Sequence, residues 1–290
     1  MKGKVLKSSI ILGVIIVLLG AVGWLSFSPC PPGKLCIVNA GQSVVEIPED
    51  VREDANSLAS EFIDSNSADY DMFVENLLEV YSEAVGNDVL LIFNSGGQGH
   101  EEIGPEWGSI LEGIKEELDR LGYTHMLVIY ERTFGGFWNF GRELIETFRS
   151  YPSKGKPLAA QIGFLTEHIE DIRVILLGES SGAMVGSQAM KLLHANDRVY
   201  SIQTGIPFYY HRAVSDRALV MNSNGIAPDS LSSGDLWTIF RANLGRIPTY
   251  RPEEGHFLFY LRTPGHIYTW DHPGVNSSIS SFLEKHFRSS

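Results

Sequence analysis

One serine of this chain stands in the sequence context that makes a hydroxyl nucleophilic. Gly178-Glu179-Ser180-Ser181-Gly182 fits the pattern G-x-S-x-G, in which a serine sits on a sharp turn between a strand and a helix. The apolar run 174–177 precedes this turn and the small residues of 183–186 follow it. This context predicts that Ser180 is a nucleophile at a helix start, where N–H groups favour developing negative charge. The alternative is an ordinary Ser/Gly-rich turn.

A serine nucleophile needs a base, and the sequence offers His266. His266 follows Thr263-Pro264-Gly265, directly after the apolar run 257–262. If that run is a parallel strand, His266 lies at its carboxyl end, on the same edge of the sheet as Ser180. His272 is the nearest rival, whereas His256 precedes the strand and His286 lies near the terminus.

The base in turn needs an acid, for which Asp229 is the first candidate. It ends the segment Asn222–Asp229, which follows the apolar run 218–221 and so reaches the same edge of the sheet. Asp235, in Ser233-Gly234-Asp235, is the alternative. Aspartate in a Gly/Pro/Ser-rich loop commonly serves only the turn itself, so the sequence leaves the choice open.

A glycine-rich loop at 95–99 supplies candidates for an oxyanion hole. One donor is expected from the backbone N–H of Ser181, the residue after the nucleophile, and a second from Gly97. Glycines let backbone N–H groups approach a substrate oxygen, so Gly96 and Gln98 are expected to contact substrate. A dinucleotide-binding loop is disfavoured, because the third glycine of G-x-G-x-x-G is missing and acidic residues follow.

Short apolar runs that alternate with amphipathic segments position these residues. Strands are expected over 89–93, 126–130, 172–177, 199–203, 218–221 and 257–262, and helices over 107–121, 140–148, 157–169, 181–193 and 277–287. This alternation predicts an α/β fold with a mostly parallel central sheet flanked by helices. Two helices, starting at Pro48 and near Tyr70, are expected before this core, close to the membrane segment described below.

With these pieces in this order, the chain resembles the α/β-hydrolase superfamily over about 88–287. The resemblance is carried by the turn 178–182, the glycine loop 95–99, the order Ser180, Asp229, His266, and the tail 265–276, where Gly-His precedes a His-Pro turn and a closing helix. It implies a serine hydrolase that cleaves an ester or related acyl bond through an acyl-enzyme. The chain departs from the family at the acid, where a longer loop ending at Asp229 replaces the usual compact one.

Other functions remain compatible with the same residues. A peptidase or an acyltransferase would use the same triad, and a binding module would keep the fold without catalysis. We expect no cofactor and no metal, since the segment 64–75 lacks the central glycine of a calcium loop. A net charge of −12 disfavours nucleic acid as a partner, and no obligatory protein partner is predicted.

The N-terminus differs from the rest of the chain. Ile10–Phe27 contains no charged residue and is about long enough to span a bilayer core. Lys2, Lys4 and Lys7 precede this segment, which predicts a single-pass signal anchor with the N-terminus in the cytoplasm and the remainder outside it. A cleaved secretory signal, which would release the domain, is the alternative.

The predicted organisation is therefore a membrane anchor at 1–27, a linker at 28–47 and a hydrolase-like domain at 48–290 with its core at 88–290. The two cysteines, Cys30 and Cys36, flank Pro31-Pro32-Gly33 within this linker. In an oxidising compartment they are expected to form a small disulfide loop.

Overall fold

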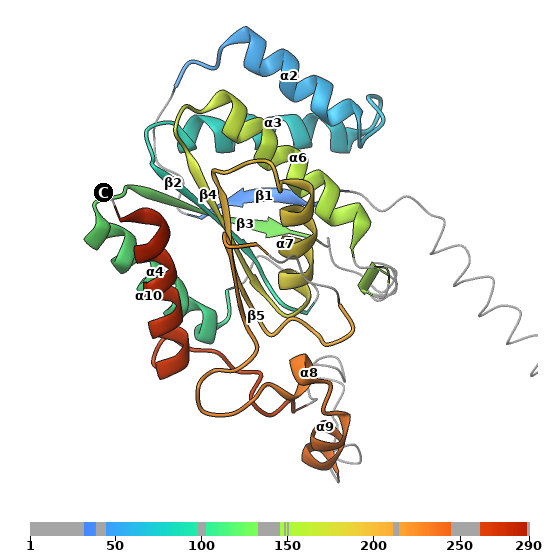
Figure 1. Ribbon diagram of the computed structural model, residues 1–290. Helices are drawn as coiled ribbons and strands as arrows, with labels where there is room; N and C mark the ends of the chain where they lie inside the picture. The colour runs from blue at the N-terminus through green and yellow to red at the C-terminus, as the bar shows by residue number, and fades with distance from the viewer. Residues whose placement is uncertain are drawn as a thin grey trace, which may run out of the picture.

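The protein is built around one mixed β-sheet, seen in a computed structural model (Figure 1). The structure describes residues 32–38, 45–97, 103–132, 146–147, 149, 151–210, 215–244 and 262–288. The sheet has the order β1-β3-β2-β4-β5-β6. Its strands are β1 (Lys34–Ile37), β2 (Val89–Asn94), β3 (His125–Glu131), β4 (Arg173–Glu179), β5 (Val199–Thr204) and β6 (Ala218–Met221). β1 runs antiparallel to β3, and the other neighbouring strands are parallel.

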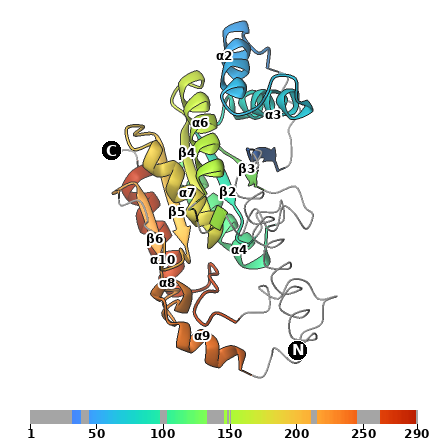
Figure 2. The ribbon, with the colours of Figure 1, turned by 90° about the vertical axis from the view of Figure 1, so that its right-hand side faces the viewer.

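Helices cover both faces of this sheet (Figures 1 and 2). α4 (Pro105–Leu121) and α10 (Pro273–Phe287) pack together on one face. α3 (Ala68–Ala84), α6 (Pro152–His168) and α7 (Ser181–Leu192) lie on the other, with α2 (Glu49–Ser60) against α3 and α6. α8 (Ser230–Ser233) and α9 (Leu236–Asn243) follow β6 at the bottom of both views, whereas α2 lies at the top.

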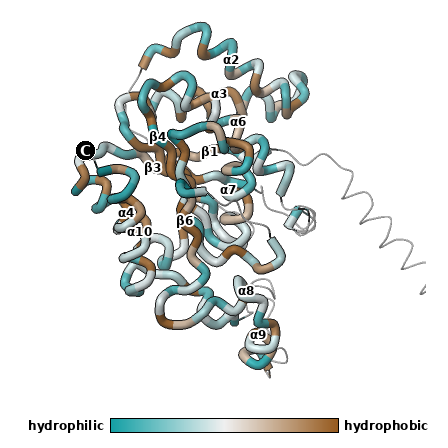
Figure 3. The backbone as a smooth tube through the Cα atoms, in the orientation of Figure 1, coloured by the Kyte–Doolittle hydropathy of each residue, from teal (hydrophilic) through white to brown (hydrophobic). Residues whose placement is uncertain are grey.

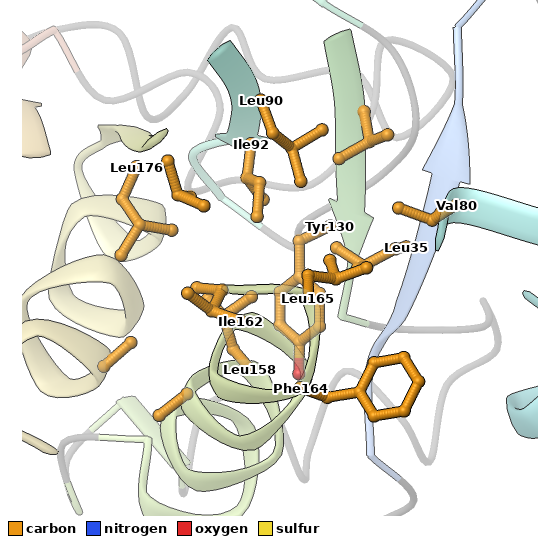
Figure 4. Close-up of a cluster of buried hydrophobic side chains, with 14 of the residues drawn as sticks. Leu35, Val80, Leu90, Ile92, Tyr130, Leu158, Ile162, Phe164, Leu165 and Leu176 are labelled. Carbon is orange, nitrogen blue, oxygen red and sulfur yellow. The ribbon is translucent and has the colours of Figure 1, made fainter. Parts of the chain in front are cut away.

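The strands alternate their side chains between two cores, one beneath each helical layer. In β2, Leu90 and Ile92 belong to the core under α6 and α7, whereas Leu91 and Phe93 belong to the core under α4 and α10. Both faces of the parallel strands are therefore apolar, and these strands appear brown in Figure 3. Figure 4 shows the first core, in which Leu35 of β1 packs near side chains of β3 and α6.

The α/β class and the mostly parallel, helix-flanked sheet expected from the sequence are confirmed. The expected linker, in contrast, contains β1, which the sequence reasoning missed. This strand is only four residues long, but Leu35 is buried and the strand pairs with β3 through all four residues. α2 and α3 likewise contribute to the same core as the sheet, through residues such as Val51 and Leu77.

Several expectations fall outside the described residues. These include most of the helix expected at 140–148, nearly all of the strand expected at 257–262, the apolar segment 10–27, and Cys30. Among the described residues no helix is long and apolar enough to cross a membrane. The signal anchor and the Cys30–Cys36 disulfide therefore stay predictions.

Candidate active site

The candidate site lies between β2 and β4, where the connections pass from one face of the sheet to the other. β2 and β4 are neighbours, but β2 leads to α4 on one face and β4 leads to α7 on the other. Such a switch point opens a crevice at the carboxyl ends of the two strands, where open α/β sheets bind ligands. The glycine loop after β2 and the Ser180 turn after β4 meet at this point, since Asn94 is paired with Gly178.

Ser180 occupies the strained position of the turn between β4 and α7. Its φ of 51° and ψ of −114° lie in a region that non-glycine residues rarely adopt. A Cβ on Gly178 would lie 2.7 Å from Ala183 Cα, and one on Gly182 would collide with the carbonyl groups of Asn94 and Ser95. Both glycines are therefore required by close packing, as the G-x-S-x-G pattern predicts.

Backbone N–H groups are available beside Ser180. The first intrahelical bond of α7 runs from Met184 N–H to Ser180 O (3.3 Å). The N–H groups of Ser181, Gly182 and Ala183 consequently have no acceptor within the helix. They form, at the positive end of α7, the kind of donor group that stabilises an oxyanion.

A buried arginine ties the glycine loop to the start of α7. The Ser181 hydroxyl donates to the carbonyl oxygen of Gly97 (2.8 Å), and Arg132 Nη2 donates to the same oxygen (3.0 Å) and to Ser181 Oγ (3.1 Å). Arg132 is fully buried, and its guanidinium lies 5.3 Å from the centre of the Tyr151 ring. These contacts fix the Gly97 carbonyl, while Gly97 itself takes a φ of 58° that favours glycine.

Glu179, the residue before the serine, is a second carboxylate at the site. Its side chain accepts a hydrogen bond from the Gly96 N–H, and a Cβ on Gly96 would lie 3.2 Å from Glu179 Oε2. Burial raises the pKa of Glu179, although the neighbouring His266 and the Gly96 N–H oppose this rise. Gly96 therefore directs its N–H to Glu179, and its expected contact with substrate stays a prediction.

Asp229 is a fully buried carboxylate that also caps α8. Its Oδ1 accepts from the N–H groups of Leu231 (2.8 Å) and Ser232 (3.1 Å), and its Oδ2 accepts from the Ser232 hydroxyl (3.0 Å). Burial alone would raise the pKa of Asp229, but the hydrogen bonds and the charge of His266 lower it overall. Asp229 is therefore held as an anion.

His266 joins Asp229 although 37 residues separate them in sequence. The Nδ1–H of His266 donates to Asp229 Oδ2 over 2.8 Å, and the hydroxyl of Tyr268 donates to the same oxygen over 2.8 Å. A donor at Nδ1 leaves Nε2 as the basic nitrogen of the neutral ring. Burial, followed by the charge of Asp229 and this hydrogen bond, raises the pKa of Tyr268 far above its usual range, so Tyr268 remains a donor.

Strand β5 connects this pair to the serine turn. The N–H of Ser180 donates to the carbonyl oxygen of Thr204 (2.9 Å). The next residue, Gly205, lies against the His266 ring: a Cβ there would be 2.5 Å from Cε1. Within the described part of the chain, the Ser180 hydroxyl makes no hydrogen bond, to His266 or to any other residue, and such bonds often tighten only when substrate is bound.

The rival residues have other roles in the structure. Asp235 is exposed and caps α9, accepting from the Thr238 N–H (3.0 Å) and hydroxyl (2.6 Å). His272 is the N-cap residue of α10, and His286 lies in the last turn of that helix. Neither histidine has a described hydrogen bond to Asp229. His256 and the expected substrate contact Gln98 lie outside the described residues.

Sequence reasoning missed four residues that shape the site: Arg132, Glu179, Gly205 and Tyr268. A signal existed for Glu179, since it stands inside the G-x-S-x-G turn, and for Tyr268, since it lies two residues from His266. Nothing local marks Arg132 or Gly205, whose importance follows from contacts between distant loops. In the described part of the chain, no cluster of three or more His, Cys, Asp or Glu side chains could hold a metal ion.

Comparisons with known proteins find distant similarity to solved structures. No protein-family model matches the chain, and no curated protein matches it in sequence. Among solved structures, it is similar to a Trichoderma reesei cutinase in complex with a phosphonate inhibitor, at 14% sequence identity and a TM-score of 0.42. The similarity covers 85% of this chain and 94% of that one. A similarity this distant does not define a function, which must come from the site.

Proposed function

We propose that the protein is a serine hydrolase with an α/β-hydrolase fold, which cleaves an ester or related acyl bond. The observation that supports this most is the 2.8 Å hydrogen bond between His266 and Asp229 at the edge of the sheet where Ser180 occupies its strained turn. Ser180 is the nucleophile, His266 the general base and then acid, and Asp229 the group that orients His266.

In the first half of the reaction, Ser180 Oγ attacks the acyl carbon as its proton passes to His266 Nε2. The carbonyl oxygen becomes an oxyanion, which the N–H groups at the start of α7, Ser181 first, stabilise by hydrogen bonds. A second donor from the glycine loop, at Gly97, completes this oxyanion hole. Collapse of the intermediate expels the alcohol, which takes the proton from His266 and leaves an acyl-enzyme.

In the second half, water attacks the acyl-enzyme. His266 Nε2 takes a proton from the water and returns it to Ser180 Oγ as the acid leaves. Asp229 remains ionised throughout and stabilises the imidazolium that forms in each half. Its lowered pKa suits this role, since a protonated Asp229 would no longer hold the positive ring.

Labelling with a fluorophosphonate probe tests the proposal. An activated Ser180 Oγ displaces fluoride from phosphorus and retains the probe covalently. We expect labelling of the wild-type protein and none of Ser180→Ala. The matched control Ser281→Ala, which changes an exposed serine of α10, should label as the wild type does. A folded wild-type protein that never labels would contradict the proposal.

The missing hydrogen bond of the Ser180 hydroxyl favours one alternative, a binding module that keeps the fold without catalysis. Absence of labelling, together with no turnover of a series of p-nitrophenyl esters, would indicate this alternative. A peptidase would label but would turn over amide substrates faster than esters. An acyltransferase would label but would transfer the acyl group to an added alcohol in preference to water.

We further propose that residues 10–27 anchor the protein in a membrane, with the N-terminus in the cytoplasm and the hydrolase domain on the other side. The uncharged run and the three preceding lysines support this topology. Protease added outside intact cells should digest the domain, and the protein should stay with the membrane in alkaline carbonate. A protein released by carbonate would contradict the anchor.

A further inference from the structure

The chain enters the sheet at the same edge as the candidate active site. β1 is antiparallel to β3, and its first residue, Lys34, pairs with Glu131, the last residue of β3. Lys34 therefore lies at the carboxyl edge, where Ser180 also lies. Gly33 is fixed there as well, since its N–H donates to the Tyr130 hydroxyl (3.2 Å). The uncharged segment ends at Phe27, and residues 28–31 add at most about 14 Å of chain.

At the other end of this edge, α9 presents its apolar side outward. Leu236, Trp237, Phe240 and Leu244, named here the apolar patch, share one side of the helix and are 59%, 65%, 54% and 70% exposed. The rings of Trp237 and Phe240 stack with centres 5.6 Å apart.

The one buried residue of α9 is polar. Asn243, its only buried residue, exchanges hydrogen bonds with the backbone of Arg262: its Nδ2 donates to the carbonyl oxygen (2.9 Å) and its Oδ1 accepts from the N–H (2.9 Å). A contiguous apolar surface turned to the outside is typical of a site that contacts a membrane, a protein partner or a ligand.

Exposed apolar side chains are concentrated at this edge. Apart from Met72 and Leu192, the large hydrophobic side chains exposed in the described part of the chain follow β5 or β6 or lie beside His266. Ile267 is 59% exposed directly after His266. Clustered acidic residues lie at the opposite end of the molecule from α9, on α2 and α3 (Figures 1 and 2), whereas α9 itself is preceded by the single exposed carboxylate of Asp235.

We infer that the carboxyl edge of the sheet faces the lipid bilayer, with the apolar patch of α9 as a second membrane contact beside the N-terminal anchor. This inference rests on the proposed anchor. The two contacts join opposite ends of the sheet: β1 and β6 are five strand spacings, roughly 24 Å, apart, and β4, which leads to Ser180, lies between them. Trp and Phe are residues that suit the membrane interface.

This orientation favours membrane lipids as substrates and changes the expected position of α2 and α3. A serine held against the bilayer surface takes acyl groups presented by lipids or lipid-linked molecules in that bilayer. α2 and α3, which the sequence placed near the membrane, become the end of the domain farthest from it. Their negative charge then lies away from anionic headgroups.

Tryptophan quenching in the full-length protein tests this inference. The protein is reconstituted in phosphatidylcholine vesicles with and without phosphatidylcholine brominated on the acyl carbons nearest the headgroup. The emission lost in Trp237→Phe reports Trp237, and that lost in Trp24→Phe reports the anchor. We expect bromolipid to quench both contributions. The matched control Trp270→Phe reports a partly buried side chain packed under α4 and α10, whose contribution should stay unquenched.

The outcomes separate the two proposals. A quenched Trp24 with an unquenched Trp237 would overturn the orientation and leave the anchor intact. An unquenched Trp24 would remove the anchor and the orientation together. Quenching of Trp237 that depends on the protein-to-lipid ratio would indicate that a second copy covers α9, which also overturns the inference. None of these readings requires the enzyme to be active.

Discussion

Gly205 lies directly against the imidazole ring of His266. A Cβ on Gly205 would stand 2.5 Å from Cε1 and 2.9 Å from Nδ1, closer than any real Cβ contact allows. Because Gly205 follows Thr204, whose carbonyl oxygen binds the Ser180 N–H, this contact sets the position of the histidine relative to the serine. Asp229 Oδ2 accepts from Nδ1 of the same ring and would lie 3.3 Å from the added Cβ, so Gly205 and Asp229 both contact the Nδ1 side of His266.

If the proposed triad operates, Gly205→Ala should therefore strongly lower ester turnover without unfolding the protein. The added methyl group displaces the ring, and a misplacement of about 1 Å lowers activity on the order of 100-fold. The positive φ of 63° adds a loss of stability of about 1 kcal/mol. Ester turnover and urea unfolding measure the two effects. Gly86→Ala is the matched control, since Gly86 has a φ of 92° and nothing within 4 Å of an added Cβ. It should lose similar stability and keep its activity; equal activity in the two variants would contradict this role.

Asp229→Asn should lower kcat by about 10⁴-fold. The amide Nδ2 facing His266 favours the tautomer with its proton on Nε2, which cannot accept the Ser180 proton. Asn remains a good helix cap, so the folded structure should persist. Asp235→Asn, which changes the other capping aspartate, should keep its rate. Comparable losses in the two variants would show that the acid had been misassigned.

Glu179→Gln should change how stability depends on pH. The folded-state pKa of Glu179 is raised above its unfolded value of about 4.3, so the wild type loses stability as pH rises from that value through the folded pKa. Gln keeps an acceptor for the Gly96 N–H but has no charge to bury. The advantage of Glu179→Gln in the free energy of unfolding should grow as pH rises from the unfolded pKa through the raised folded pKa. Glu112→Gln, on the exposed side of α4, is the control, and a parallel pH profile for the two variants would refute the prediction.

Charges in the apolar patch should act only on membrane substrates. In the double variant Trp237→Glu/Phe240→Glu, turnover of an ester embedded in phosphatidylcholine vesicles should fall by about tenfold or more, since carboxylates on the apolar side of a helix oppose its burial in the bilayer interface. Turnover of a soluble acetate ester should not change. Met72→Glu, at an exposed site on α3, should affect neither substrate. A loss on both esters would mean that the patch supports the fold and not membrane binding.

The sequence was sufficient to find the sheet because the parallel strands are buried on both faces. Val89–Asn94 and Arg173–Glu179 read as continuous apolar runs for this reason, and the expected bounds differ from the observed ones by a residue or two. β1 gave no such signal, since four residues beside prolines and glycine are too few for a pattern and their pairing depends on β3, far along the chain.

The candidate site likewise contains residues that the sequence could predict and residues that it could not. Ser180 follows β4 and Asp229 follows β6, so the rule that parallel strands end at one edge was enough to place these two residues there. The strand expected before His266 lies outside the described residues. The arrangement around the candidate triad was not accessible, because Arg132 and Gly205 act through contacts with loops that are distant in sequence. α9 was also missed. A helix that covers a core usually turns its apolar residues inward, whereas α9 turns them outward and buries Asn243.

The antiparallel edge strand has a consequence for the order in which the domain forms. Gly33 and its partner Tyr130 are 97 residues apart, so β1 has no strand to pair with until β3 has been synthesised. At about 5–20 residues per second, the ribosome needs about 5–20 s to make that stretch. The strand nearest the N-terminus is therefore the first made, but it cannot pair before β3, the third strand of the chain, has been synthesised. During translation Leu35 therefore stays outside its core until the partner strand has been made.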